Sequence, residues 1–177
     1  MAVSQPLYIF EAVDVRRADE PESSRARTIS KLVLPGIKRK TSEHTPGGGI
    51  GTVNHVFPQI DAIEPKFGVK GIDLDVLTRF GFSAGQHDKW VFSGAVRKKQ
   101  GGGMLPFRAI IEGVIAEWTP DEFSVGEILG CDHTIQEVTH YELHLDGKEL
   151  WYWDEDEQEG RAGGVSWFAE IRNALGG

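Results

Sequence analysis

Apolar and polar residues alternate along two segments of the chain, 63–70 and 134–145. Successive side chains of a β-strand point to opposite faces, so each segment is predicted to be a strand with one buried and one wet face. The polar side chains of the wet faces include Glu64, Lys66, Gln136, His140, Glu142 and His144. Asp146-Gly147 follows the second segment and is typical of a tight hairpin turn, which predicts a returning strand over residues 148–153.

Four further segments have the composition of strands. Residues 7–13 and 90–96 are rich in aromatic and β-branched side chains, and residues 28–40 predict a strand with a bend at Pro35-Gly36. Residues 107–118 are nearly all apolar, which predicts a strand buried on both faces.

Two short helices are predicted beside these strands. Asp73 can cap a helix whose apolar residues Val76, Leu77 and Phe80 have helical spacing, and Gly81 is expected to end it. The second helix begins near residue 165 and ends at Gly176. The predicted fold is mainly β with one internal and one C-terminal helix, in a sandwich-like or barrel-like subunit.

The whole chain, residues 1–177, is predicted to be a single domain with two mobile loops. The first covers residues 14–27, where charged residues, Pro21 and two serines offer little to bury. The second covers residues 45–57, because glycine-rich sequence loses much entropy when it is ordered. Its candidate contact residues are Pro46, Gly47, Gly48, Gly49 and Gly51.

The charge balance bears on possible partners. Lys plus Arg total 19 and Asp plus Glu total 27, for a formal net charge of -8, which disfavours unaided adhesion to nucleic acid or to an anionic membrane. Three short basic pieces, 16–17, 38–40 and 97–99, lack interleaved aromatic residues, so they predict a solvated face or contact with an acidic partner subunit. No membrane binding by this chain is predicted, because no apolar run approaches the ~20 residues of a span.

The candidate metal ligands are Cys131, His133, His140 and His144. On a strand, His140 and His144 lie about 13 Å apart at roughly 3.3 Å per residue. One zinc ion needs its donors at roughly 2 Å, so this pair cannot share it. No metal site is therefore predicted.

Other catalytic patterns are also missing from the sequence. The glycine runs 47–51 and 101–103 are not followed by the Lys-Ser/Thr of a phosphate-binding loop. No serine lies in a Gly-x-Ser-x-Gly elbow, and no pair of carboxylates stands out as general acid and base. The sequence predicts neither an enzyme nor a cofactor.

A dense acidic cluster follows the aromatic segment 151–153. Its members are Asp154, Glu155, Asp156, Glu157 and Glu159. Such a run is most often a solvated loop, but neighbouring exposed aromatic residues tend to mark interfaces. Both interpretations remain open at the level of sequence.

In order and spacing, these pieces resemble the major tail tube protein of contractile phages and of R-type pyocins. The resemblance extends over roughly residues 5–175, and its most specific stretch is Tyr141 to Leu150, a strand, an Asp-Gly-Lys-Glu-Leu turn and a returning strand. The other stretches are 31–40, which ends in a proline and a basic cluster, the glycine-rich loop after it, 61–64, 71–82 and 107–113.

The resemblance implies a structural virion protein. Strands of six subunits would join into a closed barrel, and hexameric rings would stack into the inner tail tube, a conduit for DNA during ejection. The implied partners are other copies of the chain, the contractile tail sheath protein, and the tape measure, baseplate and tail terminator proteins, with DNA passing transiently. The protein would reside in the virion after assembly in the host cytoplasm.

Within this scheme, three sets of residues acquire expected roles. The six polar residues of the wet strand faces are candidates for the lumen, the glycine-rich loop is a candidate inter-ring contact, and the acidic cluster 154–159 is a candidate sheath contact. Two alternatives remain: the tube of a genome-free phage-tail-like bacteriocin, and a self-contained β-barrel binding module. A hydrolase on a β scaffold would need a nucleophile or metal that the sequence does not offer.

Overall fold

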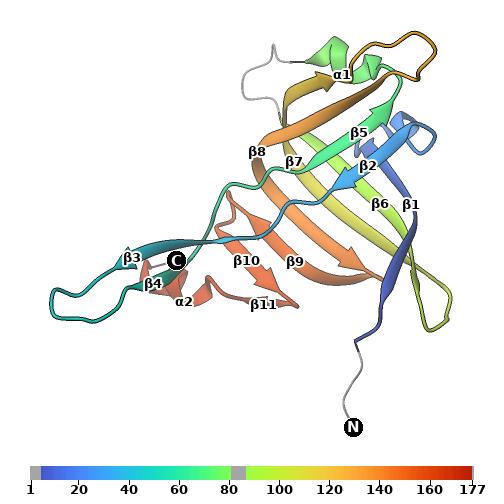
Figure 1. The fold of residues 1–177 in the computed structure, drawn as a ribbon. Coiled ribbons are helices and arrows are strands. Elements are labelled where there is room, and N and C mark those ends of the chain that lie inside the picture. Colours follow the sequence, from blue (N-terminus) through green and yellow to red (C-terminus); the bar gives the residue numbers. More distant parts are fainter. Residues whose placement is uncertain (1–4, 81–86, 177) are drawn as a thin grey trace.

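The computed structural model describes residues 5–80 and 87–176 and is built mainly of strands (Figure 1). In chain order the elements are β1 (Tyr8–Arg17), the 3-10 helix η1 (Pro21–Ser23), β2 (Ile29–Val33), β3 (Arg39–His44), β4 (Val53–Ile60), β5 (Lys66–Lys70), α1 (Leu74–Arg79), β6 (Asp88–Lys98), β7 (Met104–Pro120), β8 (Gly130–Leu145), β9 (Lys148–Asp154), β10 (Glu159–Ala162), β11 (Val165–Ser166) and α2 (Ala169–Ala174). The prediction of a mainly β chain with one internal and one C-terminal helix is confirmed.

One curled sheet forms the body of the protein. Its strands follow the order β1-β6-β7-β8-β9-β10-β11, and β5 with its partner β2 joins at β8. All of the pairings are antiparallel. The sheet curls around a core without closing into a barrel, so within the described chain it ends at β1 on one side and at the short β11 on the other.

Strand β8 has different neighbours along its length. Its first residues, Gly130 to Thr134, pair with β5, whereas His140 to Leu145 pair with β9. Between them lies an irregularity at Glu137, whose φ is 48°. Gly113 on β7 opposes this bulge, where an added Cβ would come within 2.8 Å of Ile135 and 2.9 Å of a backbone oxygen. The bulge bends β8 so that one edge serves two partner strands.

Large aromatic side chains fill the core under β2 and β5. Phe67, Trp90, Phe92 and Tyr141 are all under 2% exposed. The ring of Phe67 stacks on His133, with centroids 4.6 Å apart, and lies 5.5 Å from the ring of Trp90. Burial in this apolar setting lowers the pKa of His133 below its usual value, which favours the neutral ring.

Several predicted boundaries need correction. Strand β7 is not buried on both faces: Phe107, Ala109 and Ile111 are buried, but Arg108 is exposed, because the outer face of the sheet has no covering layer here. The predicted strand 28–40 is divided into β2 and the start of β3. The C-terminal helix is shorter than predicted, since Val165–Ser166 forms β11.

The predicted helix cap and hairpin turn are confirmed. The backbone N–H of Val76 donates to Oδ1 of Asp73 at 3.3 Å. The predicted helix end at Gly81 lies outside the described residues. Asp146 and Gly147 have φ values of 53° and 72°. These left-handed values are those of the two-residue turn that joins β8 to β9.

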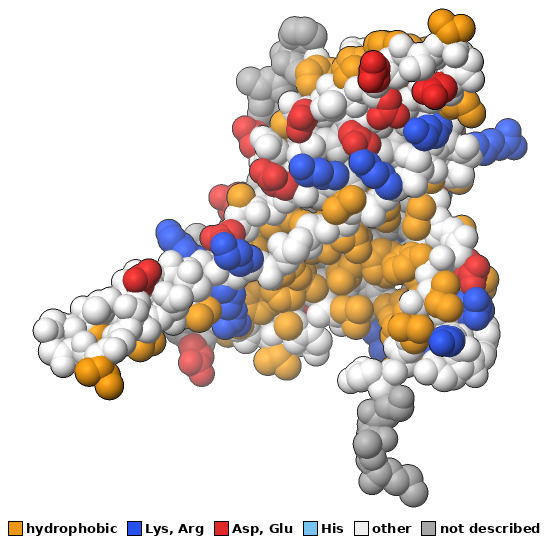
Figure 2. Space-filling model, in the orientation of Figure 1, with side chains coloured by type: hydrophobic (Ala, Val, Ile, Leu, Met, Phe, Trp, Pro, Cys, Tyr) orange, Lys and Arg blue, Asp and Glu red, His pale blue; other side chains and the backbone are white. Residues whose placement is uncertain are grey.

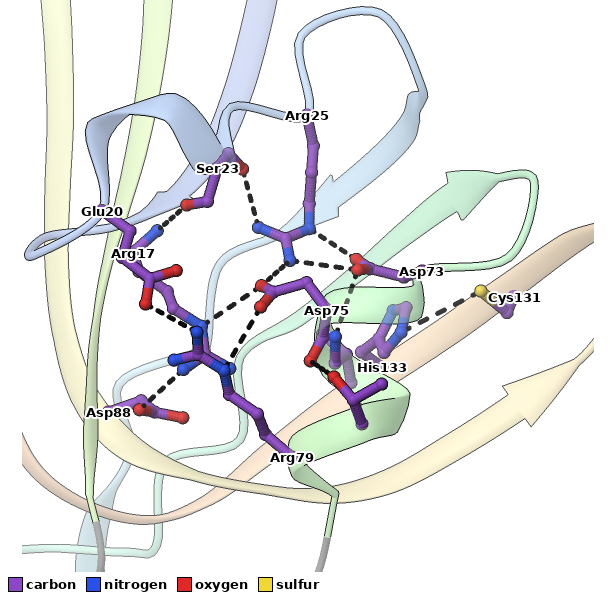
Figure 3. Close-up of polar contacts among 12 residues, drawn as sticks. Arg17, Glu20, Ser23, Arg25, Asp73, Asp75, Arg79, Asp88, Cys131 and His133 are labelled. Carbon is purple, nitrogen blue, oxygen red and sulfur yellow. Dashed lines mark hydrogen bonds and ion pairs between the residues drawn. The ribbon is translucent and has the colours of Figure 1, made fainter.

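Residues 14–17 of the predicted loop 14–27 belong to strand β1, and two buried arginines contact the start of α1 from this segment. Strand β1 continues to Arg17, and Arg17 and Arg25 are only 3% and 6% exposed (Figure 3). Arg25 donates to both carboxylate oxygens of Asp73 and, at 2.8 Å, to Asp75. Arg17 donates to Asp88 at 3.0 Å. This ion cluster fixes the chain after β1 against the start of α1.

Aromatic rings form the floor of the ion cluster. The guanidinium groups of Arg17 and Arg25 lie 5.1 and 5.3 Å from the ring centroid of Trp90. Burial alone would raise the pKa of Asp73, but the hydrogen bonds and charge of Arg25 outweigh it and hold that pKa below its usual value. The ionised carboxylate therefore favours the folded state above its unfolded pKa, and this contribution is lost as the pH falls through the lowered folded pKa.

The ion cluster leads to a stability prediction. Replacing Arg25 with methionine removes the partner of a nearly buried carboxylate, so the free energy of unfolding should fall by about 3–5 kcal/mol. Urea denaturation of the two proteins measures the difference. The matched control is Lys31→Met, which breaks the exposed pair with Asp132 and should cost about 1 kcal/mol or less. Equal losses in the two variants would contradict the prediction.

Candidate functional site

The six predicted wet-face residues do lie on the side of the sheet away from the core, in two groups. In the first group, Gln136 donates to Oε1 of Glu64 at 3.3 Å. Lys66 is exposed and is the register partner of Thr134, whose hydroxyl donates to Glu117 at 3.1 Å. These side chains form an open, mixed-charge surface beside the bulge of β8.

The second group is a chain of histidines and carboxylates along β8 and β9. His140 lies between Asp154, 2.8 Å from its Nδ1, and Glu142, 3.0 Å from its Nε2. The other carboxylate oxygen of Glu142 is 2.9 Å from Nε2 of His144. His140 is only 9% exposed, so Glu142 and His144 contribute more to the surface than His140 does. Among the described residues, no three or more His, Cys, Asp or Glu side chains are arranged so that they could hold a metal ion together.

Asp154 links this chain to the turn that follows β9. Burial by itself would raise its pKa, but a backbone N–H of Glu157 and the ring of His140 stabilise the carboxylate and hold the pKa below its usual value. The backbone N–H of Glu157 donates to Oδ1 at 2.8 Å. Through these two hydrogen bonds, Asp154 stabilises the turn between β9 and β10.

The acidic cluster 154–159 is less available to a partner than the sequence suggests. Asp154 is engaged with His140, Glu157 accepts from the hydroxyl of Tyr152 at 2.6 Å, and Glu159 pairs with Arg172 at 2.7 Å. Glu155 and Asp156 are exposed in the turn. The cluster is therefore partly a structural turn, and its free charge is concentrated at these two residues.

The hairpin of β3 and β4 was not predicted as a unit. The two strands pair with each other and extend away from the main sheet (Figure 1). The turn between them holds the glycine-rich residues, and Gly49 N–H donates to the carbonyl of Pro46 at 2.9 Å. The predicted loop 45–57 thus ends at Val53, where β4 begins. The run Val53–Phe57, rich in β-branched and aromatic residues, was a signal that the sequence contained.

Exposed apolar side chains follow the outer part of this hairpin. Val53, Val56 and Phe57 are 56%, 58% and 40% exposed, and Ile50 at the turn is fully exposed. An isolated two-stranded hairpin is marginally stable in water. The exposed apolar residues therefore point to a partner surface that the single chain does not supply.

A groove with aromatic walls lies at the base of the hairpin. It encloses about 450 Å³ between the end of β4, the turn after β9 and helix α2, and its apolar lining includes Ile60, Trp153, Trp167, Phe168 and Ile171. Figure 2 shows a broad hydrophobic area over the neighbouring concave face of the sheet. Within the described ranges, no helix is both long and apolar enough to cross a membrane.

Two chains in solved cryo-EM structures are similar to this one. One chain belongs to the cryo-EM structure of the anti-feeding prophage baseplate, with 12% identity, a TM-score of 0.47, and coverage of 81% of this chain and 97% of that one. Another belongs to the sheath/tube terminator structure of an extracellular contractile injection system, with 12% identity, a TM-score of 0.47, and coverage of 77% and 97%. No curated protein matches the chain.

The family model described as phage tail tube protein FII matches residues 22–176, which is nearly the whole chain. The match includes the β3–β4 hairpin, the shared strand β8 and both helices. The resemblance predicted from the sequence is confirmed: the chain belongs to the phage tail tube protein FII family.

Proposed function

We propose that the protein is a structural rather than an enzymatic component, which forms hexameric rings that stack into the inner tail tube of a contractile particle. The observation that carries the proposal is the β3–β4 hairpin, whose apolar side chains have no core of their own to enter. Family membership supports the tube. The exposed hairpin fits it as well, because a tube needs a subunit that is incomplete by itself. The particle is a virion, and its tail assembles in the host cytoplasm.

The open edges of the curled sheet support ring formation. Strand β1 has β6 as its neighbour on one side, and its outer residues Tyr8 and Phe10 are 41% and 49% exposed. An unprotected edge strand tends to pair with another chain. When the same contact is repeated around a symmetry axis, each exposed edge pairs with the next subunit. A closed ring therefore leaves no edge unpaired.

The polar outer face of β5 and β8 is the surface that we assign to the lumen. It carries Glu142 on β8, Glu64 just before β5 and the other wet-face residues. A wall with negative charge offers a polyanion no adhesive site, so DNA can slide along it. The tail sheath protein would surround the tube at Glu155 and Asp156, and the tape measure, baseplate and terminator proteins would contact its interior and ends.

The first test is assembly of the purified protein. At high concentration it should form six-membered rings or hollow tubes, because the hairpin and the sheet edges find partners only in other copies. Negative-stain electron microscopy and light scattering over several salt concentrations provide the measurement. A protein that stays monomeric under all of these conditions would contradict the proposal and would favour a self-contained binding module.

The hairpin turn gives a second prediction. Deleting Gly47 to Gly51 should leave a folded subunit, because these exposed residues lie outside the core, but tube formation should fall sharply. The control replaces Gly47, Gly48 and Gly51 with serine, which keeps the length of the turn and places each added Cβ in open space, and it should still assemble. Circular dichroism checks folding, and electron microscopy counts tubes. Normal tubes from the deletion variant would show that the turn takes no part in stacking.

The lumen assignment gives a third prediction. Glu64→Lys should leave tube formation intact, because an exposed position tolerates such a change, and should slow DNA ejection because phosphates gain an adhesive cation. Glu170→Lys, an exposed position on α2, is the matched control. The measurement is the rate of DNA release from particles assembled with each variant. Equal rates of DNA release for the two variants would contradict the assignment of Glu64 to the lumen.

A further inference from the structure

A compact group of exposed apolar side chains lies at the end of the body near α1. We call it the crown, and its members are Ile72, Leu74, Phe123, Val125 and Ile128. Their exposed fractions range from 52% for Ile72 to full exposure for Val125. In Figure 2 hydrophobic atoms cap this end of the molecule, above a zone of charged residues. A clustered apolar surface of this kind typically marks an interaction site.

The crown is held in place by bonds at the base of its loop. The N–H of Gly71 donates to the carbonyl of Leu129 at 2.6 Å, and the N–H of Asp121 donates to the carbonyl of Gly130 at 2.8 Å. Lys70 pairs with Asp121 at 3.2 Å. These contacts place the loop between β7 and β8 beside the start of α1 (Figure 1). The apolar side chains are therefore presented outward from a fixed base.

The charges of the crown are acidic. Its loop, residues 121–130, contains Asp121, Glu122 and Glu127 and no lysine or arginine. Asp121 is matched by Lys70, whereas Glu122 and Glu127 are exposed. A partner for this surface should therefore combine apolar side chains with positive charge.

The β3–β4 hairpin has that combination. Its apolar residues Val53, Val56 and Phe57 are exposed, and Arg39 and Lys40 are exposed near the start of β3. Lys38, just before them, is matched by Asp61 at 3.3 Å, which leaves Arg39 and Lys40 as the basic pair of the hairpin. Hairpin and crown are thus complementary in both apolar character and charge.

We infer that the crown is the docking site for the β3–β4 hairpin of a second copy of this chain. In Figure 1 the hairpin leaves the body on the side away from α1, so the hairpin of the same chain does not reach the crown. A contact between two different surfaces of identical subunits propagates from copy to copy. The inference rests on the proposed tube and names the surface that receives the next ring.

The aromatic groove beside α2 is a less suitable acceptor. It also has acidic residues on its rim, but Pro58, Gln59 and Ile60 of the chain's own hairpin already line it. A second hairpin seated there would bring together the same ends of two subunits. Such a contact would not extend a stack, because each stacked subunit must present different surfaces to the copies before and after it.

Charge reversal tests the docking. Arg39→Glu with Lys40→Glu on the hairpin, and Glu122→Arg with Glu127→Arg on the crown, should each slow tube elongation about tenfold or more, because like charges then face each other. All four changes in one chain should restore elongation, since the opposite charges are re-created in reverse. Lys99→Glu with Lys148→Glu, two exposed positions to which no contact is assigned, is the matched control for the basic pair and should elongate normally. Urea denaturation confirms that each variant is folded.

A cross-link provides a second measurement that does not depend on charge. Val56→Cys on the hairpin and Val125→Cys on the crown should form an intermolecular disulfide when the two proteins co-assemble, and neither variant alone should do so. The natural Cys131 is 2% exposed and does not compete. The docking site would be overturned if the wild-type protein forms tubes, the crown charge variant elongates normally and no cross-link forms. The proposed tube would then still stand. Absence of wild-type tubes would overturn the proposed function itself, and the docking site with it.

Discussion

The bulge of strand β8 is the constraint on which the arrangement of the subunit depends. Because β8 bends at Glu137, its first half pairs with β5 and its second half with β9. The β5–β2 pair therefore covers the core at one end of the sheet, while β9 and β10 widen the sheet at the other. The segment between β2 and β5 has no place in the sheet and emerges as the β3–β4 hairpin.

This arrangement produces a subunit that is stable in one part and incomplete in another. At the covered end, aromatic rings and the buried arginines Arg17 and Arg25 hold β1, α1 and the core together. Away from that end, the hairpin, the concave face and the edge of β1 all expose apolar surface. A subunit with a packed core that leaves these surfaces unmatched has the properties required of a repeating tube subunit.

Some acidic residues of this surface are hydrogen-bonded within the subunit, whereas others are exposed and free to contact a partner. His140 and Glu157 occupy Asp154 and thereby stabilise the turn between β9 and β10, so that residue is committed within the subunit. Glu64, Glu155 and the crown residue Glu122 remain exposed. An acidic composition alone does not reveal this division, although it decides which charges can act on a partner.

The sequence by itself determined the local elements. Alternation predicted the faces of β5 and β8, Asp146-Gly147 predicted the hairpin turn, and Asp73 predicted the start of α1, because each depends on neighbouring residues alone. Only the tertiary structure decided that Arg25 is buried, since its partner Asp73 lies far along the chain. The tertiary structure also decided that β3 and β4 leave the sheet. Segments that are distant in the sequence compete to pair with the same sheet edge, and no local pattern predicts the outcome.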